Sequence, residues 1–104
     1  MVAVAAQSLA ALLVGLAAAQ AQTPPADAIA QGRELYGDFC ASCHGRNMSA
    51  GALPGADLRQ FPKDATKRFR DAVLDGKGPA MPPWRGRLSD DDIDLLWAYV
   101  RSAL

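Results

Sequence analysis

Both cysteines and the single histidine of this chain lie within five residues, Cys40 to His44, in the order Cys-Ala-Ser-Cys-His. The chain has 104 residues, so these three side chains are its whole supply of thiols and imidazoles. A domain this short has a small hydrophobic core and usually gains stability from a disulfide, a metal or another cross-link. The motif therefore restricts the fold more than any other feature of the sequence.

Four uses of the motif differ in what else they require. A structural zinc site takes four ligands, and the motif offers three. A thioredoxin-like pair needs a strand before its helix, and the sequence predicts no strand. A disulfide across so small a loop restrains little of the unfolded chain. Covalent attachment of c-type haem needs only this motif, so we expect one haem c on Cys40 and Cys43, with His44 as an iron ligand.

Haem iron has a second axial position, and no second histidine is present to fill it. Met48 follows His44 by four residues, which extend to about 14 Å, too short a path round the porphyrin edge. Met81 lies in GKGPAMPPW, where three prolines fix backbone dihedrals and prevent a helix. We expect Met81 to be the second ligand rather than a core side chain. A lysine ligand or an open position are the alternatives.

Residues 2–21 carry no charge and are rich in alanine, and the first ionisable side chain is that of Asp27. An apolar segment that ends in Ala-Gln-Ala is typical of a secretory signal peptide. We therefore expect residues 1–21 to be a signal peptide and residues 22–104 to be one periplasmic domain. The alternative is a retained membrane anchor, since about 20 apolar residues are enough to span a bilayer.

Helical periodicity appears in three segments. Apolar residues recur at three- and four-residue steps from Ile29 to Cys43, which predicts an amphipathic helix that runs into the motif. Residues 64–76 predict a second helix, and residues 89–102 a third that Ser89 caps. Residues 45–62 are rich in Gly, Ala and Pro and predict a loop. We expect an all-α fold of three to four helices around one covalently bound haem.

A glycine inside the first predicted helix is costly unless another helix passes close to it. Gly32 is such a residue, and the terminal helix is the candidate partner.

Charge is balanced overall, with 11 basic and 11 acidic residues. This balance argues against a nucleic-acid partner. The charges are nonetheless uneven, because residues 59–70 hold five bases and one acid while four aspartates cluster within residues 90–94. These clusters are either solvated helix faces or an asymmetry that orients a redox partner.

Taken in order, GRELYGDFCASCHG, GPAMPPW and LSDDDIDLLWAYVRS resemble a class I c-type cytochrome over residues 26–104. Within that family, GALPGADLR and AVLDGKGPAMPPW resemble the small bacterial monohaem cytochromes that serve pyrroloquinoline-quinone alcohol dehydrogenases. The resemblance implies a cytochrome c domain in which the first and last helices cross near the haem. At that crossing it places Leu96, Tyr99 and Val100 against Gly32 and Tyr36. It also implies that a loop carbonyl, from Pro54 or Ala56, accepts the N–H of the axial imidazole.

The resemblance implies a single-electron carrier that is not an enzyme. Its donor would be a quinoprotein dehydrogenase, and its acceptor a terminal oxidase or another cytochrome; a membrane contact is expected only if the N-terminal segment is retained. Two alternatives are a relay subunit of a dehydrogenase or oxidase complex, and a haem enzyme or gas sensor with an exchangeable sixth ligand. Trp84 and Arg85 either reach a haem propionate or serve as a packed aromatic and a surface base.

Overall fold

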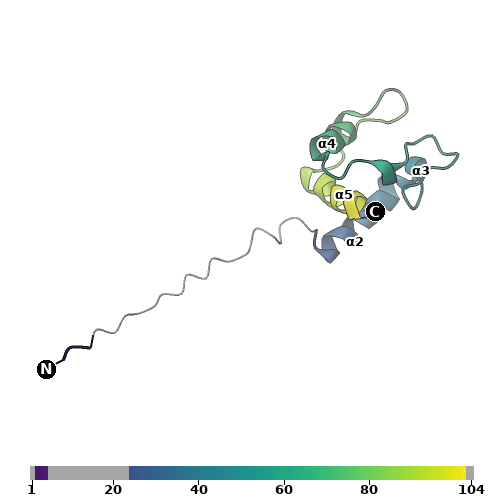
Figure 1. The fold of residues 1–104 in the computed structure, drawn as a ribbon. Coiled ribbons are helices and arrows are strands. Elements are labelled where there is room, and N and C mark those ends of the chain that lie inside the picture. Colours follow the sequence, from purple (N-terminus) through teal and green to yellow (C-terminus); the bar gives the residue numbers. More distant parts are fainter. Residues whose placement is uncertain (1, 5–23, 103–104) are drawn as a thin grey trace.

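The computed structural model describes residues 2–4 and 24–102 (Figure 1). The predicted signal peptide, residues 1–21, lies outside the described residues except at positions 2–4. Four α-helices and one 3-10 turn form within residues 24–102, which confirms the all-α prediction. They are α2 (Ala26–Phe39), α3 (Ala41–His44), η1 (Leu58–Gln60), α4 (Thr66–Asp75) and α5 (Asp90–Ser102). No helix in this described part combines the length and apolarity that a membrane crossing requires.

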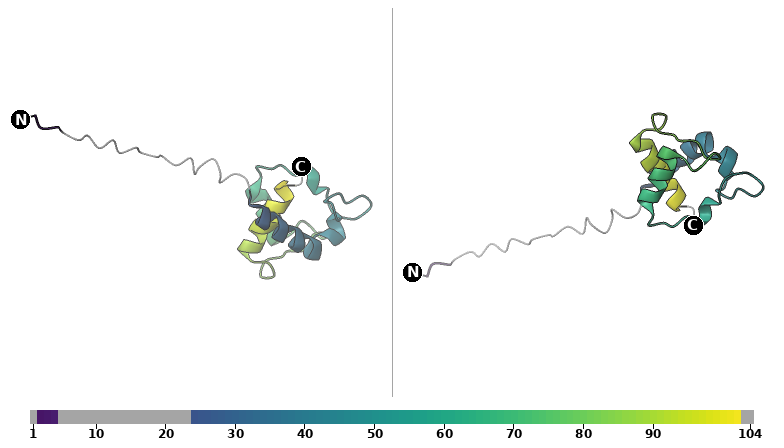
Figure 2. Two further views of the ribbon diagram at one scale, coloured as in Figure 1. Left: turned by 90° about the horizontal axis from the view of Figure 1, so that it is seen from below. Right: turned by 90° about the horizontal axis from the view of Figure 1, so that it is seen from above.

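Helices α2 and α5 cross in close contact, and both views in Figure 2 show them side by side. Gly32 lies at the crossing, where an added Cβ would be 2.0 Å from the carbonyl oxygen of Leu95 and 2.9 Å from the Cβ of Tyr99. The rings of Tyr36 and Tyr99 extend the contact edge to face, with centroids 5.3 Å apart. The predicted crossing is confirmed, with the Leu95 backbone rather than the Leu96 side chain closest to Gly32.

The helix predicted to run unbroken into the motif is interrupted at Cys40. The amide of Cys40 donates the closing hydrogen bond of α2 to Tyr36, and the Cys40 carbonyl then accepts from both Cys43 (3.2 Å) and His44 (3.0 Å). This tight turn separates α3 from α2. Helix α3 ends at Gly45, which has a φ of 86°, and a Cβ there would lie 2.2 Å from the carbonyl oxygen of Ser49, so only glycine fits.

The predicted loop, residues 45–62, has more local structure than expected. Asp57 accepts a hydrogen bond from the Arg59 amide (3.0 Å), which stabilises the short η1 turn inside it. The carbonyl of Met48 accepts from the amide of Leu58 (2.9 Å) and so ties the two ends of the loop together. Met48 has a positive φ of 62°, and its side chain is 1% exposed and lies in the core.

The core is apolar and is built largely from α4 and α5. Its buried residues are Tyr36, Met48, Phe69, Val73, Leu88, Ile93, Leu96, Trp97 and Val100. The rings of Phe69 and Trp97 stack at 4.7 Å, and the indole of Trp97 donates to the hydroxyl of Thr66 (3.0 Å). These contacts attach α4 to α5, so the two helices form one support for the segments between them.

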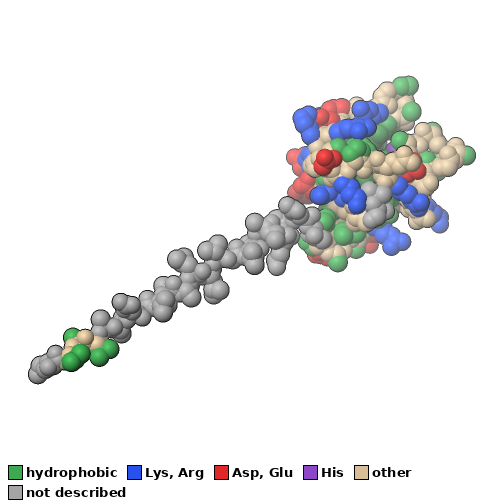
Figure 3. Space-filling model, in the orientation of Figure 1, with side chains coloured by type: hydrophobic (Ala, Val, Ile, Leu, Met, Phe, Trp, Pro, Cys, Tyr) green, Lys and Arg blue, Asp and Glu red, His purple; other side chains and the backbone are tan. Residues whose placement is uncertain are grey.

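The two charge clusters of the sequence are joined through one arginine. Arg70 of α4 forms ion pairs with Asp90 and Asp94 of α5. Acidic and basic side chains accordingly lie beside one another on the face in Figure 3. The cap of α5 is the predicted one, since Ser89 Oγ accepts from the Asp92 amide and the Asp92 carboxylate accepts from the Ser89 amide, both at 3.0 Å.

The Gly32 crossing leads to a direct test of the fold. We expect Gly32→Ala to lower the free energy of unfolding by about 1–3 kcal/mol, because its methyl group overlaps backbone atoms of α5. Gly37→Ala is the matched control in the same helix, since nothing lies within 4 Å of its added Cβ. That control should raise stability by about 0.5–1 kcal/mol, as alanine does in a helix. Equal effects of the two changes in denaturant titrations would contradict the close crossing.

Candidate functional site

Two adjoining cavities, of about 170 and 400 Å³, open between the motif on one side and the segment after α4 on the other. The smaller is lined mainly by apolar side chains, among them Leu58, Val73 and Leu96. The residues that line both cavities are His44, Ala56, Lys77 and Met81. Residues that are far apart in the sequence therefore converge on one continuous hollow.

The side chains of the motif are divided between the two cavities. Cys40 lines the smaller cavity and Cys43 the larger one, while His44 lines both. The two thiols are half-buried and are not joined in a disulfide. Burial, and secondarily the neighbouring Cys43, raises the pKa of the Cys40 thiol to about 11. In the polypeptide itself, Cys40 is therefore a neutral thiol at physiological pH, which suits an apolar wall.

The imidazole of His44 is oriented by a backbone carbonyl. Its Nδ1 lies 2.8 Å from the carbonyl oxygen of Ala56. A carbonyl can only accept, so Nδ1 carries the proton and Nε2 keeps its lone pair for a metal. Of the two carbonyls that the resemblance left open, Pro54 and Ala56, the structure selects Ala56.

Gly55 makes this hydrogen bond possible. Its amide donates to the Cys43 carbonyl (2.8 Å), which holds the loop against α3. A Cβ at this position would lie 2.4 Å from that same oxygen and 2.8 Å from His44 Nδ1. Only glycine therefore lets the loop approach closely enough for Ala56 to reach the imidazole.

Tyr36 of α2 holds the end of the motif through a hydrogen bond, a role that its helical spacing did not indicate. Its buried hydroxyl donates to the carbonyl of Gly45 (2.5 Å), the residue directly after His44. Desolvation by burial, with Cys40 and Tyr99 as further causes, raises the pKa of Tyr36 to about 12. The phenol therefore stays neutral, and remains a donor, throughout the physiological pH range.

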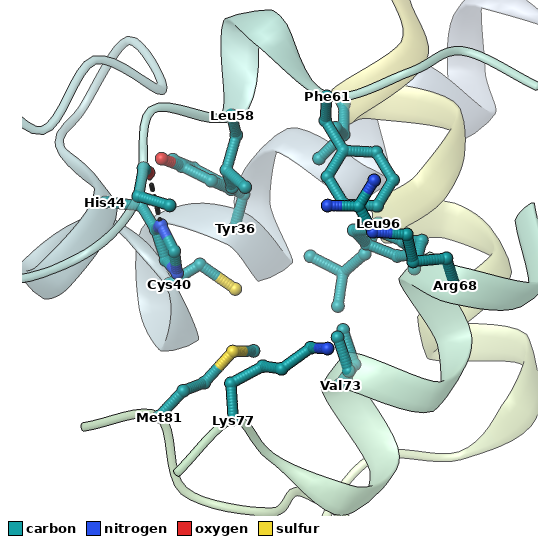
Figure 4. A pocket seen from close by; sticks show the side chains of 14 residues that line it. Tyr36, Cys40, His44, Leu58, Phe61, Arg68, Val73, Lys77, Met81 and Leu96 are labelled. Carbon is teal, nitrogen blue, oxygen red and sulfur yellow. Dashed lines mark hydrogen bonds between the residues drawn. The ribbon is translucent and has the colours of Figure 1, made fainter. Parts of the chain in front are cut away.

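Met81 faces the motif from a loop that backbone hydrogen bonds hold at both ends. Lys77 and Met81 exchange amide-to-carbonyl bonds of 3.0 and 3.3 Å, and the amide of Trp84 donates to Val73 of α4 (2.9 Å). Gly76 allows the loop to fold back, since a Cβ there would lie 2.5 Å from the Met81 carbonyl oxygen. Figure 4 shows the Met81 sulfur facing the same cavity as Cys40 and His44. Met48, in contrast, is buried in the core.

Trp84 and Arg85 are engaged with protein groups. Trp84 packs edge to face on Phe39 (5.5 Å), and the guanidinium of Arg87 lies 4.6 Å from its ring centroid. Arg85 pairs with Asp75 at 2.7 Å. The packed aromatic and surface base are thus the roles that these contacts favour, and the cations that line the smaller cavity are instead Arg68 and Lys77. Only the tertiary structure singles out that pair from the other bases.

The residues around the hollow suit haem c in their chemistry. Two thiols at a spacing of three residues can bond to a macrocycle, an imidazole with a free Nε2 can bind iron, and a thioether faces them from another element. The lining of the smaller cavity is apolar, as a porphyrin ring requires.

Comparison with known proteins identifies the family. The family model described as cytochrome c oxidase, cbb3-type, subunit III, matches residues 27–100. The chain is 39% identical over 101 residues to cytochrome c55X of Paracoccus denitrificans, covering 86% of this chain and 90% of that protein. It is 39% identical over 79 residues to cytochrome c6 of Leptolyngbya boryana, covering 72% and 91%.

A longer relative is quinohemoprotein alcohol dehydrogenase ADH IIB of Pseudomonas putida. Identity is 34% over 86 residues, which are 80% of this chain but only 12% of that protein. No solved structure matches the chain. The matches confirm the resemblance drawn from the sequence motifs. The chain belongs to the class I c-type cytochromes, all-α electron-transfer proteins that carry covalently attached haem c.

Proposed function

We propose that the protein is a periplasmic single-electron carrier with one haem c bonded to Cys40 and Cys43 and ligated by His44 and Met81. The observation that carries this proposal is the convergence of His44 and Met81, from separate segments, on one hollow that the two cysteines also line. When bound, the cofactor supplies one-electron ferric/ferrous chemistry, and His/Met ligation favours a high reduction potential. Periplasmic location rests on the predicted signal peptide, residues 1–21.

The polypeptide's task is to hold both ligands still. The Ala56 carbonyl keeps the proton on His44 Nδ1 and thereby keeps Nε2 available. Backbone hydrogen bonds at both ends of the Met81 loop hold the thioether, and the apolar lining limits the access of water. These hydrogen bonds and apolar contacts do not depend on whether the iron is ferric or ferrous. The protein therefore has little to rearrange when an electron arrives or leaves.

We propose no catalytic residue. The relatives of similar length, cytochrome c55X and cytochrome c6, are named as cytochromes rather than as enzymes. In this assignment the side chains of Cys40, His44 and Met81 are all used to hold the cofactor. A haem enzyme or gas sensor would instead need an exchangeable position, which the ligation test below examines.

The two internal methionines provide a matched test of ligation. We expect Met81→Leu, which removes the sulfur but keeps the volume, to abolish the weak sulfur-to-iron band of the oxidised protein, lower the reduction potential and let the reduced protein bind carbon monoxide. Met48→Leu is the control, since such a swap in a core costs less than about 1.5 kcal/mol. It should retain the band and exclude carbon monoxide. Loss of the band in Met48→Leu, or its retention in Met81→Leu, would assign the ligand differently.

The relationship to ADH IIB supports a quinoprotein dehydrogenase as electron donor, with a terminal oxidase or another cytochrome as acceptor. A second candidate function has support of the same kind. The matching family model is described as an oxidase subunit, and the match to ADH IIB covers a short part of a larger protein. Both favour a fixed relay within a dehydrogenase or oxidase complex.

Stopped-flow mixing of the oxidised cytochrome with a substrate-reduced quinoprotein alcohol dehydrogenase tests the donor. We expect reduction at a rate proportional to cytochrome concentration, because redox encounters are small and weak. Met81→Leu should react more slowly, because its lower potential decreases the driving force. If ascorbate reduces the wild type and the dehydrogenase does not, the donor assignment is wrong. Co-purification with a larger redox subunit at native expression levels would favour the fixed relay over the diffusing carrier.

A further inference from the structure

The smaller cavity has an unusual balance of charge. Of the 14 described residues that line it, none is an aspartate or glutamate, whereas Arg68 and Lys77 are both cationic. Figure 4 shows Arg68 extending from α4 and Lys77 from the segment that follows it. Two positive charges beside an apolar hollow attract an anionic group.

Arg68 differs from the bases on either side of it. Lys67 pairs with Asp71 one turn along the helix (2.5 Å), and Arg70 pairs with the aspartates of α5. Arg68 has no carboxylate partner among residues 24–102, and its guanidinium lies 5.0 Å from the ring centroid of Phe61. The aromatic contact holds the guanidinium plane at the edge of the cavity.

Lys77 follows α4 and is held at its backbone by the exchange of hydrogen bonds with Met81. Its side chain lines both cavities. The next base along the chain, Arg85, pairs with Asp75, whereas no acidic side chain in the described part of the protein pairs with Lys77. Lys77 thus provides a second unpaired cation on the same wall.

We propose that Arg68 and Lys77 form a carboxylate-binding pair that holds the two propionate groups of the haem. This inference rests on the proposed haem site. Arg68 offers a planar fork that matches a carboxylate in two places, and Lys77 offers a mobile point charge. Of the two residues that the sequence suggested for this role, Arg85 pairs with Asp75, and Trp84 lines the larger cavity with its ring packed on Phe39. The pair also places positive charge next to the cofactor, which favours the reduced, more negative state of the site.

Single-charge deletions test the pair in the intact haem-loaded protein. Arg68→Gln and Lys77→Gln should each shift the ferric/ferrous equilibrium about threefold towards ferric, a drop of roughly 30 mV at about 59 mV per tenfold change. Lys67→Gln is the matched control, because it removes the same charge one residue away from a side chain outside the cavity. It should shift the equilibrium much less. Arg68→Lys, which keeps the charge, should recover most of the potential.

Redox-difference infrared spectra supply a readout that a purely structural role would not move. We expect Arg68→Gln and Lys77→Gln to displace the carboxylate bands of the haem propionates, and Lys67→Gln to leave them in place. Shifts no larger than that of Lys67→Gln, with unmoved carboxylate bands, would overturn the pair. If the sulfur-to-iron band persists in those samples, the haem site itself stands. Absence of that band from the wild type would overturn the ligation and, with it, this inference.

Discussion

The close crossing of α2 and α5 at Gly32 is the contact on which the other features depend. Because α2 leads directly into the motif, its position against α5 determines where Cys40, Cys43 and His44 begin their turn. Helix α5 also carries the core residues that receive α4, and α4 in turn anchors the Met81 loop. The two sides of the hollow are thus connected through a single helix. A side chain at Gly32 would disturb both.

Within this frame, backbone groups do most of the positioning. The Ala56 carbonyl orients His44, the carbonyl of Val73 holds the amide of Trp84, and the Gly45 carbonyl accepts from Tyr36. Backbone groups are placed by the fold and have no rotamers to lose on ordering. The cavity walls can therefore be apolar without losing control of the few polar atoms that face them.

The basic side chains from Lys67 to Arg85 fall into two groups, those paired with carboxylates and those that line the cavity. Exposed ion pairs contribute roughly 0–1 kcal/mol each, so the pairs at Lys67, Arg70 and Arg85 add little to stability. Their effect is to neutralise the outer surface of α4 and the segment after it. Arg68 and Lys77 are left with their charge directed at the cavity, where a carboxylate ligand would be recognised.

The sequence by itself determined the family, the all-α class, the haem-attachment motif and the choice of Met81 over Met48 as the candidate ligand. These follow from residue types and spacings within short segments, including the reach of the four residues after His44. Tertiary structure alone decided the choice of Ala56 over Pro54, the support from Tyr36, and which bases face the cavity. Each of those depends on the distance between segments remote in sequence, and local periodicity carries no information about that distance.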